Sequence, residues 1–156
     1  MLELKVLIAE DEPASRLLAK RLVSKLGHQV VLAEDGHEAL QILKEDSTIG
    51  VLITDCYMPK LDGFELAAAV QSNDKLNHIA CVLASADNRL RHRARDARFF
   101  AWIKKPLKAE NIAPILSHHF VQNLKMAAAP STASAGNTGS TGNASSTPTT
   151  EMSAKP

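Results

Sequence analysis

Short apolar runs alternate with amphipathic segments along most of the chain. The runs are too brief for helices, which predicts buried strands. The segments between them repeat apolar residues at helical spacing and carry charged residues on their other faces. The predicted strands are residues 5–9, 28–33, 50–54, 79–84 and 101–104, and the predicted helices are residues 13–26, 36–44, 63–70, 87–97 and 109–124.

The first predicted helix shows the amphipathic pattern. Leu17, Leu18, Leu22 and Leu26 recur at helical spacing, so we expect them to face the core. Pro13 suits the first turn of this helix, because that turn makes no use of the amide hydrogen that proline lacks.

Five strand-helix pairs with short links require a parallel sheet that is covered on both faces. Right-handed crossovers place the helices there, and nearly continuous apolar strands fit burial on both sides. The sequence therefore predicts a doubly wound α/β domain over about residues 1–126, with a five-stranded parallel sheet and five helices.

The composition changes abruptly after this domain. Residues 127–156 consist mainly of Ala, Ser, Thr, Gly, Asn and Pro, with Glu151 and Lys155 as their charged residues. Such a segment buries too little apolar surface to offset its ordering entropy, so we expect a disordered linker or tail. As a random coil it has an end-to-end distance of about 30 Å, enough to tether another domain.

Length and composition narrow the class of protein. A chain of 156 residues with 45% hydrophobic residues has room for one domain with a real core. It lacks the roughly 20 consecutive apolar residues of a membrane span, and its acidic start does not resemble a signal peptide. Cys56 and Cys81 lie in apolar stretches and predict reduced thiols. We therefore expect a cytoplasmic protein, including the cytoplasmic part of a membrane-bound one, with no membrane contact by this segment.

Charged and polar residues stand where the predicted strands end. Glu10 and Asp11 follow the first strand, Asp55 the third, Ser85 the fourth and Lys105 the fifth. Each alone has a structural explanation, such as a helix cap or a solvated lysine. Together they form a set that simple structural roles explain poorly, because the carboxyl ends of parallel strands meet at one edge of the sheet.

This set has a chemical interpretation. Three converging carboxylates repel one another unless a cation compensates them, and their oxygen atoms suit Mg²⁺. Asp55 would be the nucleophile that accepts a phosphoryl group. Ser85 would donate a hydrogen bond to a phosphoryl oxygen, and Lys105 would bring a positive charge to another.

The motifs around these residues resemble one family. They are Glu10-Asp11-Glu12-Pro13, Asp55-x-x-Met58-Pro59-x-x-Asp62-Gly63, Ser85-Ala86 and Lys105-Pro106. Over about residues 4–125 the chain resembles the receiver domain of the two-component response-regulator family, most closely the receivers fused to hybrid sensor histidine kinases. The resemblance implies a flavodoxin-like fold.

The resemblance also implies a reaction and a metal site. Asp55 would take a phosphoryl group from a phosphohistidine on a histidine kinase or a histidine phosphotransfer domain. Asp11 and Asp55 would be direct Mg²⁺ ligands, Glu10 would act mainly through water, and the main-chain carbonyl of Tyr57 would complete the set.

Two aromatic residues bear on the lifetime of the phosphorylated state and on the conformational change that transmits the signal. By the resemblance, Ser85 and Trp102 correspond to the switch pair of the family, in which the aromatic ring follows the hydroxyl inward. The alternative is a tryptophan simply packed on the last strand. Tyr57 is large enough to crowd the approach of water to the phosphoryl group, and we hypothesise that it slows phosphate loss.

The densest run of positive charge lies near the fourth predicted helix. Helical spacing puts Arg91, Arg95 and Arg98 on one flank, and Arg89 with Arg93 on another. The simplest interpretation is a solvated face, and the alternative is a docking surface for an acidic protein partner. Nucleic acid is disfavoured, because no recognised DNA-binding motif or set of stacking aromatics accompanies the run.

Three functional classes compete. The first is a phosphoacceptor module of a phosphorelay; the linker composition and the motif around Asp55 favour a hybrid sensor kinase as its setting, and the alternative is a stand-alone regulator. The second is a phosphohydrolase of the haloacid-dehalogenase type, which normally carries a second Asp where Tyr57 stands here. The third is a degenerate receiver that acts only as an interaction module. The intact set of site residues favours the first.

Overall fold

The computed structural model describes residues 3–128, in which five strands alternate with five helices. The strands are β1 (Lys5–Ala9), β2 (Gln29–Ala33), β3 (Val51–Asp55), β4 (Ala80–Ser85) and β5 (Ala101–Lys104). The helices are α1 (Pro13–Lys25), α2 (Gly36–Glu45), α3 (Gly63–Gln71), α4 (Leu90–Asp96) and α5 (Ala109–Ala128). The predicted elements are therefore confirmed in kind and in order.

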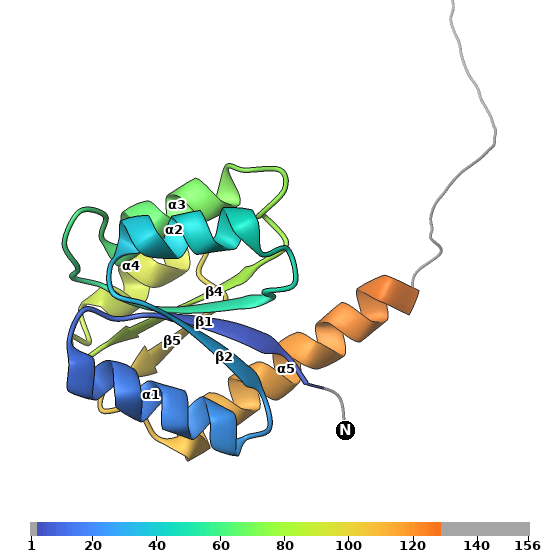
Figure 1. Ribbon diagram of the computed structural model, residues 1–156, viewed down its shortest axis with the longest axis horizontal. Coiled ribbons are helices and arrows are strands. Elements are labelled where there is room, and N and C mark those ends of the chain that lie inside the picture. Colours follow the sequence, from blue (N-terminus) through green and yellow to red (C-terminus); the bar gives the residue numbers. More distant parts are fainter. Residues whose placement is uncertain (1–2, 129–156) are drawn as a thin grey trace, which may run out of the picture. The chain divides into compact units, whose positions relative to one another are not determined.

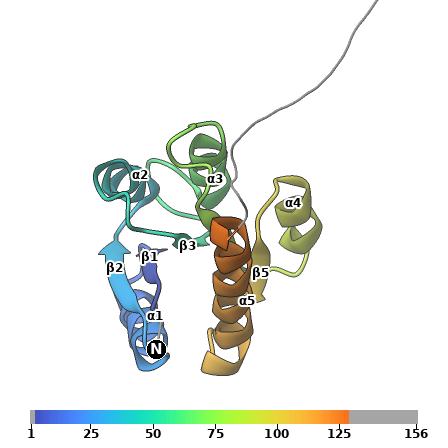
Figure 2. The same ribbon diagram turned by 90° about the vertical axis from the view of Figure 1, so that its right-hand side faces the viewer.

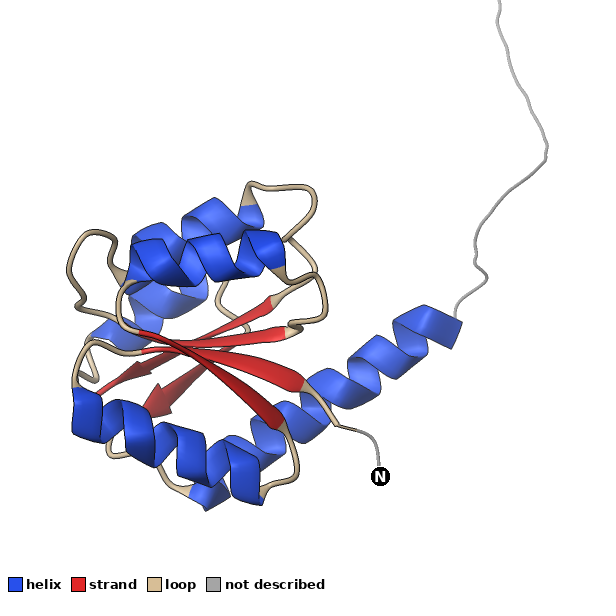
Figure 3. Cartoon of the chain, viewed as in Figure 1, coloured by secondary structure: helices blue, strands red, loops and turns tan. Residues whose placement is uncertain are grey.

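The strands form one parallel sheet in the order β2-β1-β3-β4-β5. By contacts the chain divides into two compact units, Met1–Ser117 and His118–Pro156, and the sheet belongs to the first. Within that unit α1 and the start of α5 cover one face of the sheet, and α2, α3 and α4 cover the other (Figures 1 and 2). Figure 3 shows the strands as the layer between them. The predicted doubly wound α/β fold is confirmed.

The strand register aligns the carboxyl ends of the central strands. Ala9 of β1 lies beside Thr54 of β3, and Asp55 is the next and last residue of β3. Ser85 of β4 lies beside Lys104 of β5. Residues at these strand ends, and the residues that follow them, therefore meet at the edge where doubly wound sheets place their reactive groups.

The central strands are buried, which restricts charged side chains to the ends of these strands. Leu7, Leu52 and Leu83 are completely inaccessible, each in a different strand. β3 is buried from Val51 to Thr54 and becomes half-buried only at Asp55. A charged group costs much less free energy at such a rim than inside the sheet, so Asp55 takes the first position at which a carboxylate is tolerated.

The buried stripe of α1 differs from the one predicted. Ala19 and Val23 face the core, whereas Leu17 and Leu18 are 45% and 43% exposed. At 100° per residue, Leu17 is turned about 160° from Ala19 and Leu18 about 100°, so neither can share its face. Leu22 lies closer to that face and is half-buried. Small residues face the sheet here, and two leucines are left at the surface.

The fourth helix is shorter than predicted. It covers Leu90–Asp96 rather than residues 87–97. The Asp87 carboxylate accepts a hydrogen bond from the main-chain N–H of Arg89 at 2.9 Å, which holds a turn in front of the helix. After the helix, Arg98 adopts a left-handed conformation with φ of 63°.

The last helix runs to Ala128, two residues past the predicted end of the domain. The rest of the predicted tail, residues 129–156, lies outside the described residues. None of the helices within residues 3–128 combines the length and apolar character that crossing a membrane requires.

Candidate functional site

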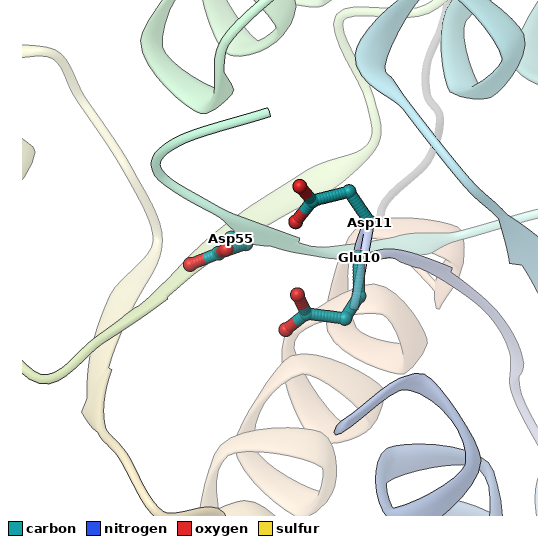
Figure 4. A group of neighbouring side chains, drawn as sticks. All are labelled: Glu10, Asp11 and Asp55. Atoms are coloured by element: carbon teal, nitrogen blue, oxygen red, sulfur yellow. The ribbon is translucent and has the colours of Figure 1, made fainter. Parts of the chain in front are cut away.

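Three carboxylates gather at the ends of β1 and β3. Glu10 and Asp11 directly follow β1, and the register places them beside Asp55 at the end of β3. One oxygen atom from each lies within 4.8 Å of the other two (Figure 4). Glu10 is buried, Asp55 is half-buried and Asp11 is exposed, so the cluster opens to solvent on one side.

Lys105 provides a cation for this cluster. Its Nζ lies 2.6 Å from Glu10 Oε1 and 3.2 Å from Asp55 Oδ1. It reaches them from the residue after β5, so residues 95 positions apart in sequence are joined. With every group ionised, three carboxylates and one ammonium leave the cluster with two negative charges.

Burial and charge pull the pKa values in this cluster in different directions. Burial raises the pKa of Glu10, and the Asp55 charge adds to the rise against the hydrogen bond from Lys105. Burial works to lower the pKa of Lys105, but the hydrogen bond to Glu10 and the charges of Asp55 and Glu10 outweigh it, so that pKa is raised. Lys105 therefore stays positive at neutral pH.

The main chain around Asp55 is held on several sides. Asp55 Oδ1 accepts a hydrogen bond from the Cys56 N–H at 2.9 Å, and Thr54 Oγ1 donates to the Asp55 carbonyl at 2.9 Å. The Gly63 N–H donates to the Cys56 carbonyl at 2.8 Å. A Cβ on Gly63 would lie 2.3 Å from the Asp55 carbonyl oxygen, so only glycine lets α3 begin this close to the end of β3.

Ser85 is buried at the end of β4, on the next strand from Asp55. Its Oγ accepts a hydrogen bond from the Asp87 N–H at 3.1 Å, which leaves the hydroxyl hydrogen free to be donated elsewhere. Its carbonyl accepts from the Lys105 N–H at 3.0 Å. The loops that carry Ser85 and Lys105 are thereby tied together.

The two aromatic residues singled out from the sequence are not part of the carboxylate cluster. Tyr57 is 65% exposed in the loop after β3. Trp102 is half-buried and pairs with Leu83, two residues before the end of β4. Its Nε1 is buried and finds no hydrogen-bond partner among the described residues, and the Arg91 guanidinium lies 5.8 Å from the centre of its ring.

The arginines near α4 are divided among different neighbours. Arg89 forms an ion pair with Asp87 at 2.8 Å, and the Arg93 guanidinium lies 3.8 Å from the centre of the Phe64 ring. Arg91 and Arg95 line a hollow between α4 and β5.

Arg98 does not share a flank with Arg91 and Arg95, so that prediction was wrong. It lines a separate hollow beside Phe64 of α3. The reason is that α4 ends at Asp96, and the left-handed conformation of Arg98 turns the chain away from the helical path.

One residue near the site was predicted only as a helix start. Gly36 begins α2, and a Cβ there would lie 2.0 Å from the Leu61 carbonyl oxygen in the loop after β3. The available sequence signal for this close packing was a glycine directly after the capping residue Asp35. That glycine did not indicate that the loop containing Leu61 packs against it.

Comparison with known proteins identifies the family. Residues 6–117 match the family described as the response regulator receiver domain. The chain is 39% identical over 83 residues to the gliding motility regulatory protein of Myxococcus xanthus, covering 53% of this chain and 11% of that protein. It is 34% identical over 115 residues to the sensor protein EvgS of Escherichia coli K12, covering 74% and 10%. The chain thus spans about a tenth of the length of these relatives.

Solved structures give the same fold. A response regulator receiver domain protein from Clostridium thermocellum superposes with a TM-score of 0.72 at 25% identity, covering 78% of this chain and 98% of that one. The receiver domain of the sensor histidine kinase PA1611 from Pseudomonas aeruginosa, solved with a magnesium ion in its active site cleft, gives 0.70 at 20% identity, covering 77% and 99%.

A third structure contains a partner protein. The complex of the phosphotransfer protein Ypd1 with the receiver domain of Ssk1 from Saccharomyces cerevisiae gives a TM-score of 0.71 at 21% identity, covering 78% and 91%. The fold, the carboxylate cluster and the family match over 6–117 agree. This chain therefore belongs to the response regulator receiver domain family, and it is a receiver domain of two-component signalling.

Proposed function

We propose that Asp55 accepts a phosphoryl group from a phosphohistidine of a histidine kinase or a histidine phosphotransfer domain. The observation that carries the proposal is the meeting of three carboxylates from two strands with the ammonium of Lys105 from a third. Helix caps or solvated surface charges do not require such a meeting. A half-buried carboxylate beside a fixed ammonium group is a suitable nucleophile for phosphoryl transfer.

The donor set fits Mg²⁺. Glu10, Asp11 and Asp55 offer carboxylate oxygens within 4.8 Å of one another, and the open side of the cluster leaves room for water and phosphate. The cluster's two negative charges match a divalent cation. We assign the carboxylates of Asp11 and Asp55 and the Tyr57 carbonyl as direct ligands and Glu10 as a ligand through water. An ion held by these residues would neutralise charge on the oxygens of the transferring group.

The transfer is a single displacement at phosphorus. Oδ1 of Asp55 already accepts from Cys56 and lies near Lys105, so we assign Oδ2 as the attacking atom. The Oδ2–P bond forms as the N–P bond of the phosphohistidine breaks. The electron pair of that bond goes to the ring nitrogen, and the imidazole leaves neutral because its other nitrogen carries the proton. The product is an acyl phosphate.

Two side chains receive the new charge. Lys105 Nζ lies between Glu10 and Asp55 at 2.6 and 3.2 Å, so a small movement brings it to a phosphoryl oxygen. The Ser85 hydroxyl, held by the Asp87 N–H, has its hydrogen available for another oxygen. These contacts strengthen as the charge arrives, as electrostatic stabilisation requires.

The partner would approach along α1 and the loop after β3. Leu17, Leu18 and Tyr57 are large hydrophobic side chains that are exposed to solvent. α1 begins two residues after Asp11, so Leu17 and Leu18 stand in the first two turns of the helix that follows the cluster. Exposed apolar side chains of this kind suit a docking surface for a phosphotransfer protein. The EvgS and Ssk1 comparisons fit both a receiver inside a sensor kinase and one served by a separate phosphotransfer protein.

A second contact would be made with an acidic protein at α4. Arg91 and Arg95 remain side by side at one hollow, whereas Arg89 pairs with Asp87 and Arg93 covers Phe64. We therefore narrow the predicted docking surface to Arg91 and Arg95. Nucleic acid remains disfavoured on the sequence grounds given above.

The acceptor is tested by incubation with a small phosphodonor and Mg²⁺, followed by intact mass measurement. Wild type should gain one phosphoryl group, and Asp55→Asn should gain none. A matched control is Asp62→Asn, since asparagine is as good a helix cap as aspartate and Asp62 caps α3. An adduct that persists in Asp55→Asn would sink the assignment, and no adduct on wild type would favour the degenerate receiver.

A further inference from the structure

The loop after β3 packs against the start of α2 without a side chain between them. At Gly36, the first residue of α2, a Cβ would lie 2.0 Å from the Leu61 carbonyl oxygen and 2.8 Å from Leu61 Cβ. Both distances are shorter than real Cβ contacts allow. The main chain of Leu61 therefore occupies the space that any other residue at 36 would need.

This contact is one of several that fix the loop. The Leu61 N–H donates to the Pro59 carbonyl at 2.7 Å, and Lys60 adopts a left-handed conformation with φ of 70°. Lys60 Nζ lies 3.6 Å from the carboxylate of Asp35, the residue that caps α2. The loop is thus tied at its far end to α2, and at its base to the residues around Asp55.

The loop carries Tyr57, whose carbonyl is assigned above as a metal ligand. Five residues separate Asp55 from Leu61, so a shift of Leu61 is passed along a short and well-tethered stretch. An alanine at 36 would push the Leu61 carbonyl outward by about 1.4 Å or more to reach an ordinary van der Waals contact. A misplacement of about 1 Å in a site can lower rates by about 10²-fold.

We propose that Gly36 is a positioning residue of the phosphorylation site. Its lack of a side chain lets the loop after β3 rest on α2, and this sets where the Tyr57 carbonyl stands relative to the three carboxylates. The inference rests on the proposed function for its consequence in phosphoryl transfer. The contact itself is independent of that function.

The helix gives Gly36 no reason of its own to be glycine. Asp35 caps α2 by accepting a hydrogen bond from the Glu38 N–H at 2.7 Å, and this does not involve residue 36. Alanine is a better helix former than glycine. A substitution to alanine therefore stabilises the helix and disrupts only the contact with Leu61. This separates the effect of residue 36 on the helix from its effect on the loop.

The test compares Gly36→Ala with His37→Ala, an exposed neighbour in the same helical turn. Three quantities are measured: amide hydrogen exchange of residues 56–62, the dissociation constant of Mg²⁺ by calorimetry, and the rate of phosphoryl uptake from a small donor. Gly36→Ala should exchange faster in the loop, bind Mg²⁺ several-fold more weakly and take up phosphate about 10- to 10²-fold more slowly. His37→Ala should match wild type in all three.

The outcomes separate the inference from the proposed function. Equal loop exchange and equal Mg²⁺ affinity in Gly36→Ala and wild type overturn the inference. A wild type that takes up no phosphate overturns the proposed function, while loop exchange still decides whether Gly36 holds the loop. A double-mutant cycle with Leu61→Gly guards against poor folding. The loss in unfolding free energy of the double mutant must be smaller than the sum of the two single losses, since Leu61→Gly removes the Cβ contact and frees the loop main chain to move away from residue 36, and additive losses contradict the contact.

Discussion

The carboxylate cluster and the arginines of α4 are both dense in charge, but the fold treats them in opposite ways. Glu10, Asp55 and Lys105 are far apart in sequence, and the strand register brings them into direct contact. Arg91, Arg93 and their neighbours are adjacent in sequence, and the helix turns them toward different partners.

The difference follows from geometry. Parallel strands deliver their carboxyl ends to one edge, so residues after separate strands accumulate there. A helix turns by about 100° per residue, so alternate residues point to nearly opposite sides. Charged residues that follow parallel strands therefore come together in one site. Charged residues on a short helix point in different directions unless they are three or four positions apart.

Removal of Lys105 should give the largest effect. Lys105→Met deletes the cation between Glu10 and Asp55, so phosphoryl uptake should fall about 10²- to 10³-fold, as when one transition-state donor is lost. Uptake is timed by intact mass with a small phosphodonor. Lys104→Met is the matched control, because Lys104 is exposed at the end of β5. Equal losses in both variants would show that general charge, and not the cluster, matters.

Tyr57 should have a smaller effect, on phosphate lifetime. If its ring crowds the approach of water, Tyr57→Ala should lose phosphate several-fold faster than wild type. The measurement follows the phosphorylated protein after donor removal. Tyr57→Phe, which keeps the ring and removes only the hydroxyl, serves as the control and should match wild type. An unchanged or slower loss of phosphate in Tyr57→Ala would contradict the hypothesis. It would mean that the Tyr57 ring, which is 65% exposed, does not obstruct the approach of water.

Arg93 of α4 should contribute to stability and not to phosphoryl transfer. Arg93→Ala removes a guanidinium 3.8 Å from the Phe64 ring, so the unfolding free energy should fall by about 0.5–1 kcal/mol. Denaturant titration measures it. Arg95→Ala, exposed and without a ring contact of this kind, should stay within about 0.5 kcal/mol of wild type. Slower phosphate uptake in Arg93→Ala would mean that the two charged regions are coupled.

The smallest expected effect concerns a polar contact away from both regions. His28 Nδ1 accepts a hydrogen bond from the Leu4 N–H at 3.0 Å, and burial lowers the pKa of His28 from its ordinary 6.5. The unfolded chain therefore binds the imidazole proton more readily than the folded protein does. The contribution of neutral His28 to the free energy of unfolding is complete above about pH 6.5 and is lost as the pH falls through the pKa of His28 in the folded protein.

The check is thermal unfolding between pH 7.5 and about 5. His28→Gln keeps an acceptor for Leu4 and removes the titration, so it should lose less stability than wild type over this range. Parallel pH profiles for the two proteins would show that His28 has no such part in stability.

The sequence predicted most of the fold because each strand carries a strong local signal. It also predicted which site residues meet, since any residue that follows a parallel strand arrives at the same edge. The meeting of Glu10, Asp55 and Lys105 could be predicted without knowing any side-chain conformation.

Contacts between elements were harder to predict. The pattern of α1 suggested that Leu17 faces the core, but the small residue Ala19 packs there instead. Arg98 left the predicted flank because the helix stopped before it. The approach of Leu61 to Gly36 depends on how the loop after β3 packs on the start of α2, and neither segment's own sequence indicates it.

The most direct test of the central claim is to locate the phosphoryl group. Wild type is incubated with Mg²⁺ and a small phosphodonor, treated with borohydride, which reduces an acyl phosphate to the alcohol, and then analysed by peptide mass spectrometry. The account predicts that residue 55 alone is converted from aspartate to homoserine, and that conversion depends on Mg²⁺. Conversion at Asp11 or Asp62, or at no residue, would contradict it.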